Sequence, residues 1–402
     1  MISRSLPLAG IRVLELGNYI AAPTAGRLLA DFGAEVVKVE RPGVGDELRS
    51  WRLYSGTTSM LYRAVNRNKR SVELDLRTES GRHTALDLAS RSDVVIENFR
   101  PGTLEGWGLG PQQLDDARPG IVLVRISAYG QNGPLAAEPG FAAVAEAVGG
   151  LRALVGEPDR PPARTGVSIG DTLAGLYGAF GALVLLLHQA RDPDSPSLPL
   201  AERIVDVALS ESVLSVTESL VPDHFAYGIE RHRTGGRIEG IAPSNAYRCS
   251  DGSSVVIAGN GDGVFLRFMN AIGRPDLASR ADLAENPGRW ALREELDAAI
   301  EEWTSARPRS EVLETLLAAG VPGGPIATAA DIAADSQYAA RSMIQYFDID
   351  TGAGVRRVGF PGVVPVIGGR SLPIRSLGPD LGEHNQEVLT RSLPEPTEHP
   401  EG

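Results

Sequence analysis

The first 130 residues alternate between short apolar runs and longer segments with helical periodicity. Short runs bounded by turn residues are typical of buried strands, and the two amphipathic segments at 21–33 and 78–91 predict helices. Strands that alternate with helices predict a parallel sheet with helices on its faces, so we expect a Rossmann-like large domain. No G-x-G-x-x-G follows the first strand, so a dinucleotide cofactor is not indicated. The strand-like runs are 11–16, 34–40, 71–76, 93–98 and 121–130.

A long helix is predicted over residues 171–190, because no charge interrupts residues 172–187. The uncharged stretch is shorter than the ~20 apolar residues that a membrane-spanning helix requires. We therefore expect a buried helix. Gly175, Gly178 and Gly181 form a smooth stripe along it, which suits either packing in the core or a contact between subunits.

The character of the sequence changes near residue 225. Residues 246–263 predict a hairpin followed by a Gly-rich loop, and two helical segments come next. We expect a large domain that begins with 1–224, a small α+β domain at 225–325, and a return to the large domain at 326–402 with a frayed tail.

The composition of the chain argues against several classes of partner and cofactor. A net charge of −12 and a pI near 5.1 argue against a nucleic-acid or anionic-membrane partner, because either would need a dominant basic surface. Cys249 is the only cysteine, so an intrachain disulfide is impossible and a reducing, cytoplasmic location is expected. Six scattered histidines make a metal site improbable, and no metal or redox cofactor is expected.

Asp171 stands where a small-residue loop gives way to the long helix. An aspartate immediately before a helix is a favoured N-cap, since its side chain accepts hydrogen bonds from the unpaired amides of the first turn. The same amides and the helix dipole favour the ionised carboxylate and keep it available as a nucleophile. Capping and catalysis are compatible, and the local pattern does not separate them.

Several separated strings together resemble the class III CoA-transferase family, which includes formyl-CoA:oxalate and carnitine CoA-transferases. The most specific are NRNKRSVELDL at 66–76, VIENFRPG at 95–102 and the helix-opening Asp171. The other strings include AGRLLADFGAEVVKVERPGVGDELR, ISAYGQNGP, AAGVPGGPI and LGEHNQEVL, and the resemblance runs nearly end to end.

The resemblance implies a mechanism and a set of site residues. Asp171 would attack the acyl carbon of a CoA thioester and would then carry CoA as an aspartyl thioester. The loop Gly259-Asn260-Gly261-Asp262-Gly263 would be a lid over this site, although Gly, Asn and Asp are also what ordinary turns use. Coenzyme A would be a substrate. The expected CoA-binding and substrate-binding residues are Asn18, Tyr19, Ile20, Ala21, Arg41, Leu74, Arg77, Asn98, Phe99 and Phe141.

An acidic protein needs a local cluster of positive charge to attract the phosphates of CoA. One short segment offers Arg63, Arg67, Lys69, Arg70 and Arg77. A solvated basic turn is the better interpretation of Arg63 and Arg67. Arg41 and Arg77 are the favoured phosphate contacts.

The sequence departs from the family where Ala142 follows Phe141, because many members carry an acidic residue there. A missing carboxylate leaves room and removes negative charge, so we expect the acceptor acid to be a C4 or C5 dicarboxylate. The expected donor is an acyl-CoA thioester such as succinyl-CoA. The alternatives are a 2-methylacyl-CoA racemase-like isomerase and a non-catalytic CoA-binding protein. The racemase would need a His at position 141, and Phe cannot transfer protons.

The resemblance also implies an interlocked homodimer, with each active site between the large domain of one subunit and the small domain of the other. Nothing in the periodicity of the sequence bears on this assembly.

Overall fold

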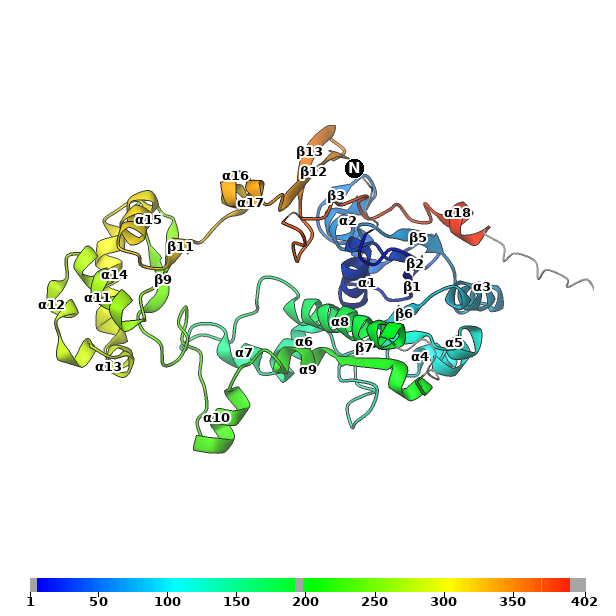
Figure 1. Ribbon diagram of the computed structural model, residues 1–402, viewed down its shortest axis with the longest axis horizontal. Helices are drawn as coiled ribbons and strands as arrows, with labels where there is room; N and C mark the ends of the chain where they lie inside the picture. The colour runs from blue at the N-terminus through cyan, green and yellow to red at the C-terminus, as the bar shows by residue number, and fades with distance from the viewer. Residues whose placement is uncertain (1–5, 192–197, 370, 391–402) are drawn as a thin grey trace, which may run out of the picture. The chain divides into compact units, whose positions relative to one another are not determined.

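The computed structural model describes residues 6–191, 198–369 and 371–390. The chain forms two compact units (Figure 1), here called unit 1 (1–150, 166–217 and 336–402) and unit 2 (151–165 and 218–335). Unit 2 begins earlier and ends later than the predicted 225–325. It also includes 151–165, which the sequence analysis assigned to the large domain. The acidic, proline-rich end at 393–402, which was predicted to fray, lies outside the described residues.

Unit 1 is built on a six-stranded parallel sheet in the order β5-β2-β1-β6-β7-β8. Numbered along the sheet's own strands, this order is 3-2-1-4-5-6, that of doubly wound nucleotide-binding folds. The mixed α/β class with a parallel sheet is therefore confirmed. The strands are β1 (Arg12–Glu15), β2 (Glu35–Glu40), β5 (Arg70–Glu73), β6 (Val94–Glu97), β7 (Val122–Ser127) and β8 (Ile204–Ala208).

Helices and two small hairpins complete unit 1. The hairpins pair β3 (Tyr54–Ser55) with β4 (Thr58–Ser59), and β12 (Ile344–Asp350) with β13 (Val355–Pro361). The helices are α1 (Ala21–Asp31), α2 (Met60–Val65), α3 (Glu79–Ser90), α4 (Thr103–Gly106), α5 (Pro111–Ala117), α6 (Ala142–Val148), α8 (Ile169–Arg191), α9 (Leu209–Leu214), α17 (Ser336–Ala340) and α18 (Asn385–Leu389).

The glycines of α8 pack against the rest of unit 1. A Cβ at Gly175 would lie 2.7 Å from the carbonyl oxygen of Ala21 in α1, and one at Gly181 would lie 2.4 Å from Cγ1 of Val205 in β8. The stripe therefore serves packing within the chain, which was one of the two interpretations left open. Only glycine allows the helix to approach α1 and the sheet this closely.

The opposite face of α8 is exposed, so the expectation of a buried helix is wrong for that face. Its exposed apolar side chains are Leu176, Tyr177, Phe180, Leu183, Val184 and Leu187. Among the described residues α8 is the one helix long and apolar enough to cross a membrane, and 33% of its apolar window is buried inside the chain. By itself this is weak evidence for a membrane span.

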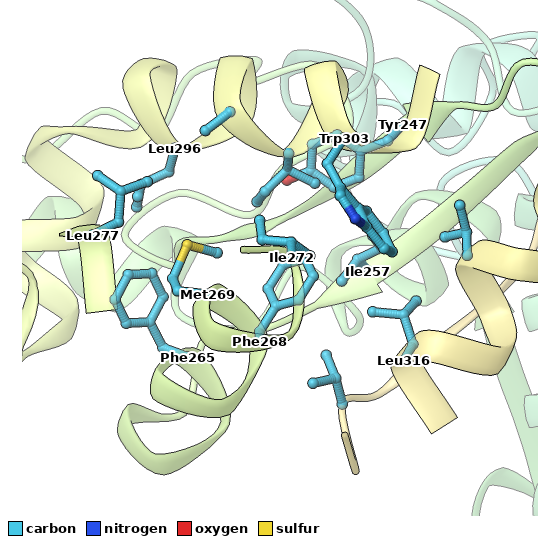
Figure 2. Close-up of a cluster of buried hydrophobic side chains, with 14 of the residues drawn as sticks. Tyr247, Ile257, Phe265, Phe268, Met269, Ile272, Leu277, Leu296, Trp303 and Leu316 are labelled. Atoms are coloured by element: carbon cyan, nitrogen blue, oxygen red, sulfur yellow. The ribbon is translucent and has the colours of Figure 1, made fainter. Parts of the chain in front are cut away.

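Unit 2 packs helices against a three-stranded antiparallel sheet in the order β11-β10-β9. Its core contains Phe265, Phe268, Met269, Leu296 and Trp303 (Figure 2). The strands are β9 (Ser244–Arg248), β10 (Ser254–Ala258) and β11 (Gly323–Pro325). The helices are α7 (Leu151–Leu154), α10 (Leu220–Tyr227), α11 (Asp262–Ala271), α12 (Pro275–Ala278), α13 (Asn286–Ala291), α14 (Arg293–Ser305), α15 (Arg309–Ala318) and α16 (Ala329–Ala334).

Candidate active site

The strand order of unit 1 reverses between β1 and β6. After β1 the chain continues to β2 on one side, whereas β6 lies on the other side of β1. Ligands of open α/β sheets bind outside the carboxyl ends of the strands at such a reversal. Two of the predicted CoA-binding residues meet there: Asn18 follows β1 and Asn98 follows β6.

The two asparagines are joined by a reciprocal pair of hydrogen bonds. The backbone N–H of Asn18 donates to Oδ1 of Asn98 (2.8 Å), and Nδ2 of Asn98 donates to the carbonyl oxygen of Asn18 (2.8 Å). Gly17 makes room for this pair, because a Cβ there would lie 2.5 Å from Oδ1 of Asn98 and 2.4 Å from the Cβ of Ala22. The loop between β1 and α1 is thus tied directly to the end of β6.

The other predicted CoA-binding residues lie at the carboxyl ends of neighbouring strands. Arg41 directly follows β2, and Leu74 and Arg77 follow β5. Both guanidinium groups are accessible and paired with carboxylates: Nη2 of Arg41 lies 2.6 Å from Oε1 of Glu47, and Nε of Arg77 lies 2.9 Å from Oδ1 of Asp75. A phosphate would therefore compete with a carboxylate at each arginine.

An aromatic cluster adjoins the loop after β1. The ring of Tyr19 lies 5.9 Å from the ring of Phe141 and 5.9 Å from that of Trp51, measured between centroids. Phe141 is 66% exposed and Trp51 is 40% exposed, so the cluster faces solvent. Phe99, at the end of β6, packs edge-on against Trp107 at 5.1 Å. Sequence reasoning missed Trp51, whose only signal was an aromatic residue in a polar loop.

Asp171 is the third residue of α8 and is half-buried in its first turn. The helix begins at Ile169, so Asp171 is not the N-cap residue, and the capping interpretation is wrong in that detail. The preceding Gly170 is buried, and a Cβ there would lie 3.4 Å from the carbonyl oxygen of Ala142. The segment Phe141–Ala142 therefore passes beside the start of α8. At this position the helix dipole favours an ionised carboxylate.

The basic segment 63–77 does not form one exposed cluster. Arg67 is buried and pairs with Asp31 (2.7 Å), so its interpretation as part of a solvated turn is wrong. Lys69 is also buried, whereas Arg63 pairs with Asp380 and Arg70 with Glu35. Of the five, Arg77 keeps the most accessible position, with 68% of its side chain exposed.

A buried charge network lies beneath the loop after β1 and was missed by the sequence analysis. Lys38 and Lys69 both pair with Glu15, at 3.1 and 2.7 Å. Burial lowers the pKa of Lys69 to about 8, and the charge of Lys38 adds to this effect. Burial acts in the same direction on Lys38, but Asp46 and Glu15 outweigh it and raise the pKa of that ammonium. The signal available in the sequence was that Lys38 and Lys69 are its only lysines.

The predicted lid belongs to unit 2. Gly259 is buried after β10, and Gly261 is exposed just before α11. Arg289, which the sequence analysis also missed, holds the loop. It is fully buried and donates to the carbonyl oxygen of Asn260 (2.7 Å) and to Oδ1 of Asp262 (2.6 Å). Its remaining hydrogen bonds go to the carbonyl oxygens of Ala242 (3.1 Å), Leu283 (3.0 Å) and Ala284 (2.9 Å).

The fold and the site define a class of protein: an α/β protein with nucleotide-binding strand order and a carboxylate at a helix start beside the binding edge. The sequence matches CoA-transferase family III over residues 8–385. The chain belongs to this family and is a CoA-transferase.

Named relatives and a solved structure agree with this assignment. The chain is 42% identical to the succinyl-CoA–D-citramalate CoA-transferase of Chloroflexus aurantiacus, over 96% of this chain and 94% of that protein. It is 34% identical to the succinyl-CoA:mesaconate CoA-transferase of Haloarcula hispanica, over 95% of each chain. A crystal structure of a CAIB/BAIF family protein from Brucella suis superposes with a TM-score of 0.83 at 34% identity, covering 96% of this chain and 99% of that one.

Proposed function

We propose that the protein transfers CoA from succinyl-CoA to a C4 or C5 dicarboxylic acid, with Asp171 as the covalent carrier. The observation that carries the proposal is the position of Asp171. Asp171 lies in the first turn of α8, the preceding Gly170 lies against Ala142, and the neighbouring Phe141 contacts Tyr19 in the loop after β1.

The reaction would proceed through four balanced steps. Asp171 attacks the acyl carbon of succinyl-CoA, which forms a mixed anhydride and releases CoA thiolate. The thiolate attacks the carboxyl carbon of Asp171, which gives an aspartyl-CoA thioester and frees succinate. The acceptor carboxylate attacks this thioester and again releases thiolate. The thiolate then attacks the acceptor's acyl carbon, which yields the new CoA thioester and restores the Asp171 carboxylate.

Each step develops an oxyanion that backbone N–H groups can stabilise, by about 3–4 kcal/mol per well-placed donor. The first turn of α8 has N–H groups without intrahelical acceptors, which makes it one source of donors. The loop Gly259-Asn260-Gly261 is the proposed lid that excludes water from the aspartyl thioester. This role for the loop depends on the family resemblance.

A dicarboxylate acceptor is supported by two arguments. Ala142 occupies a position where many family members carry an acidic residue, so a second carboxylate meets less repulsion beside Phe141. The named relatives act on citramalate and mesaconate, both dicarboxylic acids.

The proposal includes a homodimer. The exposed apolar face of α8 is larger and more continuous than the scattered apolar residues that monomeric surfaces normally show. A second copy of the chain is the occupant that the family resemblance implies, and sedimentation at increasing protein concentration tests it. A monomer at all concentrations would contradict this part of the proposal.

The covalent step can be tested with labelled succinyl-CoA and a panel of acids. We expect label to move to citramalate, malate, mesaconate or itaconate in preference to monocarboxylates, and hydroxylamine to trap an adduct at Asp171. The Asp171→Ala protein should form no adduct, whereas Thr172→Ala, in the same helical turn, should retain transfer. Exchange of an α-proton without CoA transfer would instead support an isomerase.

A further inference from the structure

The two lysines of the chain converge on one carboxylate. The sequence has 39 basic Lys and Arg residues, and all but Lys38 and Lys69 are arginine. Neither lysine side chain is exposed, and the two Nζ atoms lie on different oxygens of Glu15. A compact ammonium can approach several acceptors in a small space, whereas the planar guanidinium of arginine needs a wider one.

The remaining partners of the two lysines differ. Nζ of Lys38 donates to the carbonyl oxygen of Gly17 (2.7 Å) and lies 2.8 Å from Oδ2 of Asp46. The other carboxylate oxygen of Asp46 accepts the backbone N–H of Tyr19 (3.0 Å). Lys38 therefore contacts the loop after β1 on both sides of Asn18, directly at one side and through Asp46 at the other.

Lys69 reaches other parts of unit 1. Its Nζ donates to the carbonyl oxygen of Pro23 in α1 (2.7 Å) and to Oδ1 of Asn66 (2.8 Å). It shares with Lys38 its burial and its partner Glu15, but its hydrogen bonds within the described part of the chain go to Glu15, Pro23 and Asn66 rather than to residues 17–20. The chain thus supplies its own control for the effect of Lys38.

The residue that this network holds has an unfavourable backbone conformation. Tyr19 has φ 63°, in the left-handed region that non-glycine residues seldom adopt. Such a conformation persists where the surrounding contacts over-determine it, and it concentrates at functional sites. In this conformation the Tyr19 ring contacts both Phe141 and Trp51.

We propose that Lys38 is a positioning residue for the transfer reaction. Through the Gly17 carbonyl and Asp46 it holds Tyr19 in its left-handed conformation and so presents the Tyr19 ring and the adjoining backbone to the thioester end of CoA. This inference rests on the proposed function of the site. It assigns Lys38 no contact with the substrate.

The test compares Lys38→Met with Lys69→Met. Both substitutions remove one buried ammonium from Glu15, so both should lower stability. Only Lys38→Met should raise KM for the CoA thioester, by about tenfold, with a smaller change in kcat. It should also speed backbone hydrogen exchange at residues 17–20, measured by mass spectrometry. Equal KM values and equal exchange in the two variants would overturn the assignment.

A double-mutant cycle separates positioning from general loss of structure. Glycine adopts positive φ without strain, so in a Tyr19→Gly background the further change Lys38→Met should raise KM less than about twofold. An undiminished tenfold effect would mean that Lys38 does not act through Tyr19, and would refute the proposal.

A second variant covers the case in which Lys38→Met fails to fold. Asp46→Asn keeps an acceptor for the Tyr19 N–H but loses the ion pair with Lys38, and should raise KM about threefold; an unchanged KM would count against the proposal. If the wild-type enzyme transfers no CoA, the proposed function is refuted. The role of Lys38 in holding the loop would then be judged separately, by comparing hydrogen exchange at residues 17–20 in the Lys38→Met and Lys69→Met proteins.

Discussion

The loop at 17–20 in unit 1 and the loop at 259–263 in unit 2 are each held by a fully buried cation, but with different acceptors. Lys38 is compensated by two carboxylates that are themselves buried, Glu15 and Asp46. Arg289 is compensated mainly by carbonyl oxygens, and its one carboxylate partner, Asp262, has 67% of its side chain exposed.

This difference indicates that the two loops move differently. Releasing the loop at 17–20 would take the Gly17 carbonyl from the buried ammonium of Lys38 and the Tyr19 N–H from the buried carboxylate of Asp46, and a buried charged group that loses a hydrogen bond is costly. Releasing Asp262 moves a carboxylate into water and leaves Arg289 bonded to its carbonyl partners. We therefore expect the first loop to be static and the second to open at its Asp262 end, which is the motion that the lid role proposed above would need.

The largest predicted effect concerns Arg289. Arg289→Met should lower the free energy of unfolding by about 3–5 kcal/mol, because several buried carbonyl oxygens and Asp262 lose their donor. The control is Arg267→Met. Arg267 also donates to three carbonyl oxygens, those of Gly263, Ala319 and Gly320, but it is exposed. Arg267→Met should therefore lower the free energy of unfolding much less than Arg289→Met. Urea unfolding measures both, and similar losses would contradict the role of burial.

The next effect is a pH dependence that comes from Glu40 in unit 1. Burial alone would raise the pKa of Glu40, but hydrogen bonds from Arg49 and the charge of Lys38 lower it to about 2. A carboxyl group with a pKa lower in the folded than in the unfolded chain stabilises the protein above the unfolded pKa of 4.5, and this contribution disappears as the pH falls toward 2. The loss amounts to about 3 kcal/mol.

Carbonyl acceptors do not titrate in this range, so the contacts of Arg289 to carbonyl oxygens should persist. Hydrogen exchange at decreasing pH should therefore rise around Glu40 before it rises around Arg289. The Glu40→Gln protein should be less stable than the parent at neutral pH but should lose less stability in acid. Parallel pH profiles for the two proteins would show that Glu40 is not the group responsible.

A third prediction compares a glycine-to-alanine substitution in the loop at 17–20 with one in the loop at 259–263. Gly17→Ala places a Cβ against Ala22 and Asn98, and should cost about 1–3 kcal/mol and raise KM for the CoA thioester. Gly261 has φ −71°, and its nearest contact for a Cβ is Val264 at 3.6 Å, so Gly261→Ala should be neutral or stabilising by up to about 1 kcal/mol. Thermal unfolding measures the stability of both variants and steady-state kinetics their KM. If both variants had the same stability and the same KM, the two loops would not differ in how tightly they are packed.

The smallest effect is expected for Asp262→Asn. The substitution weakens a partly exposed ion pair, so stability should fall by less than about 1 kcal/mol. Exchange at residues 259–263 should nevertheless rise by about threefold, and hydrolysis of the thioester should increase relative to transfer. Unchanged exchange would mean that Asp262 does not restrain the loop.

Much of unit 1 was predictable, because buried parallel strands are nearly continuous apolar runs. The run at 121–130 became β7, and the periodic segment at 78–91 became α3. The strand predicted at 71–76 ends instead at Glu73, since Asp75 starts a turn in which its carbonyl oxygen accepts the N–H of Thr78 (3.0 Å). A local turn overrides the apolar pattern there.

The charged residues were less predictable than the apolar ones. Asn18 and Asn98 were found through resemblance, and the strand order then explains why they meet. The burial of Arg67 and Lys69 depends on Asp31 and Glu15, which are distant in the sequence, and no local pattern reveals such partners. The role of Arg289 could not be predicted either, since all but one of its acceptors are backbone carbonyls, which have no sequence signature.

The burial of both lysines has a chemical consequence for an enzyme that handles activated acyl groups. Thioesters and anhydrides acylate free amines, and in proteins the amines modified are mostly those of lysine side chains. Here neither ε-amine reaches solvent, because both are enclosed at Glu15. The enzyme therefore carries no lysine side chain on its surface for its own substrates to acylate, and amine-reactive labels should leave Lys38 and Lys69 of the folded protein unmodified.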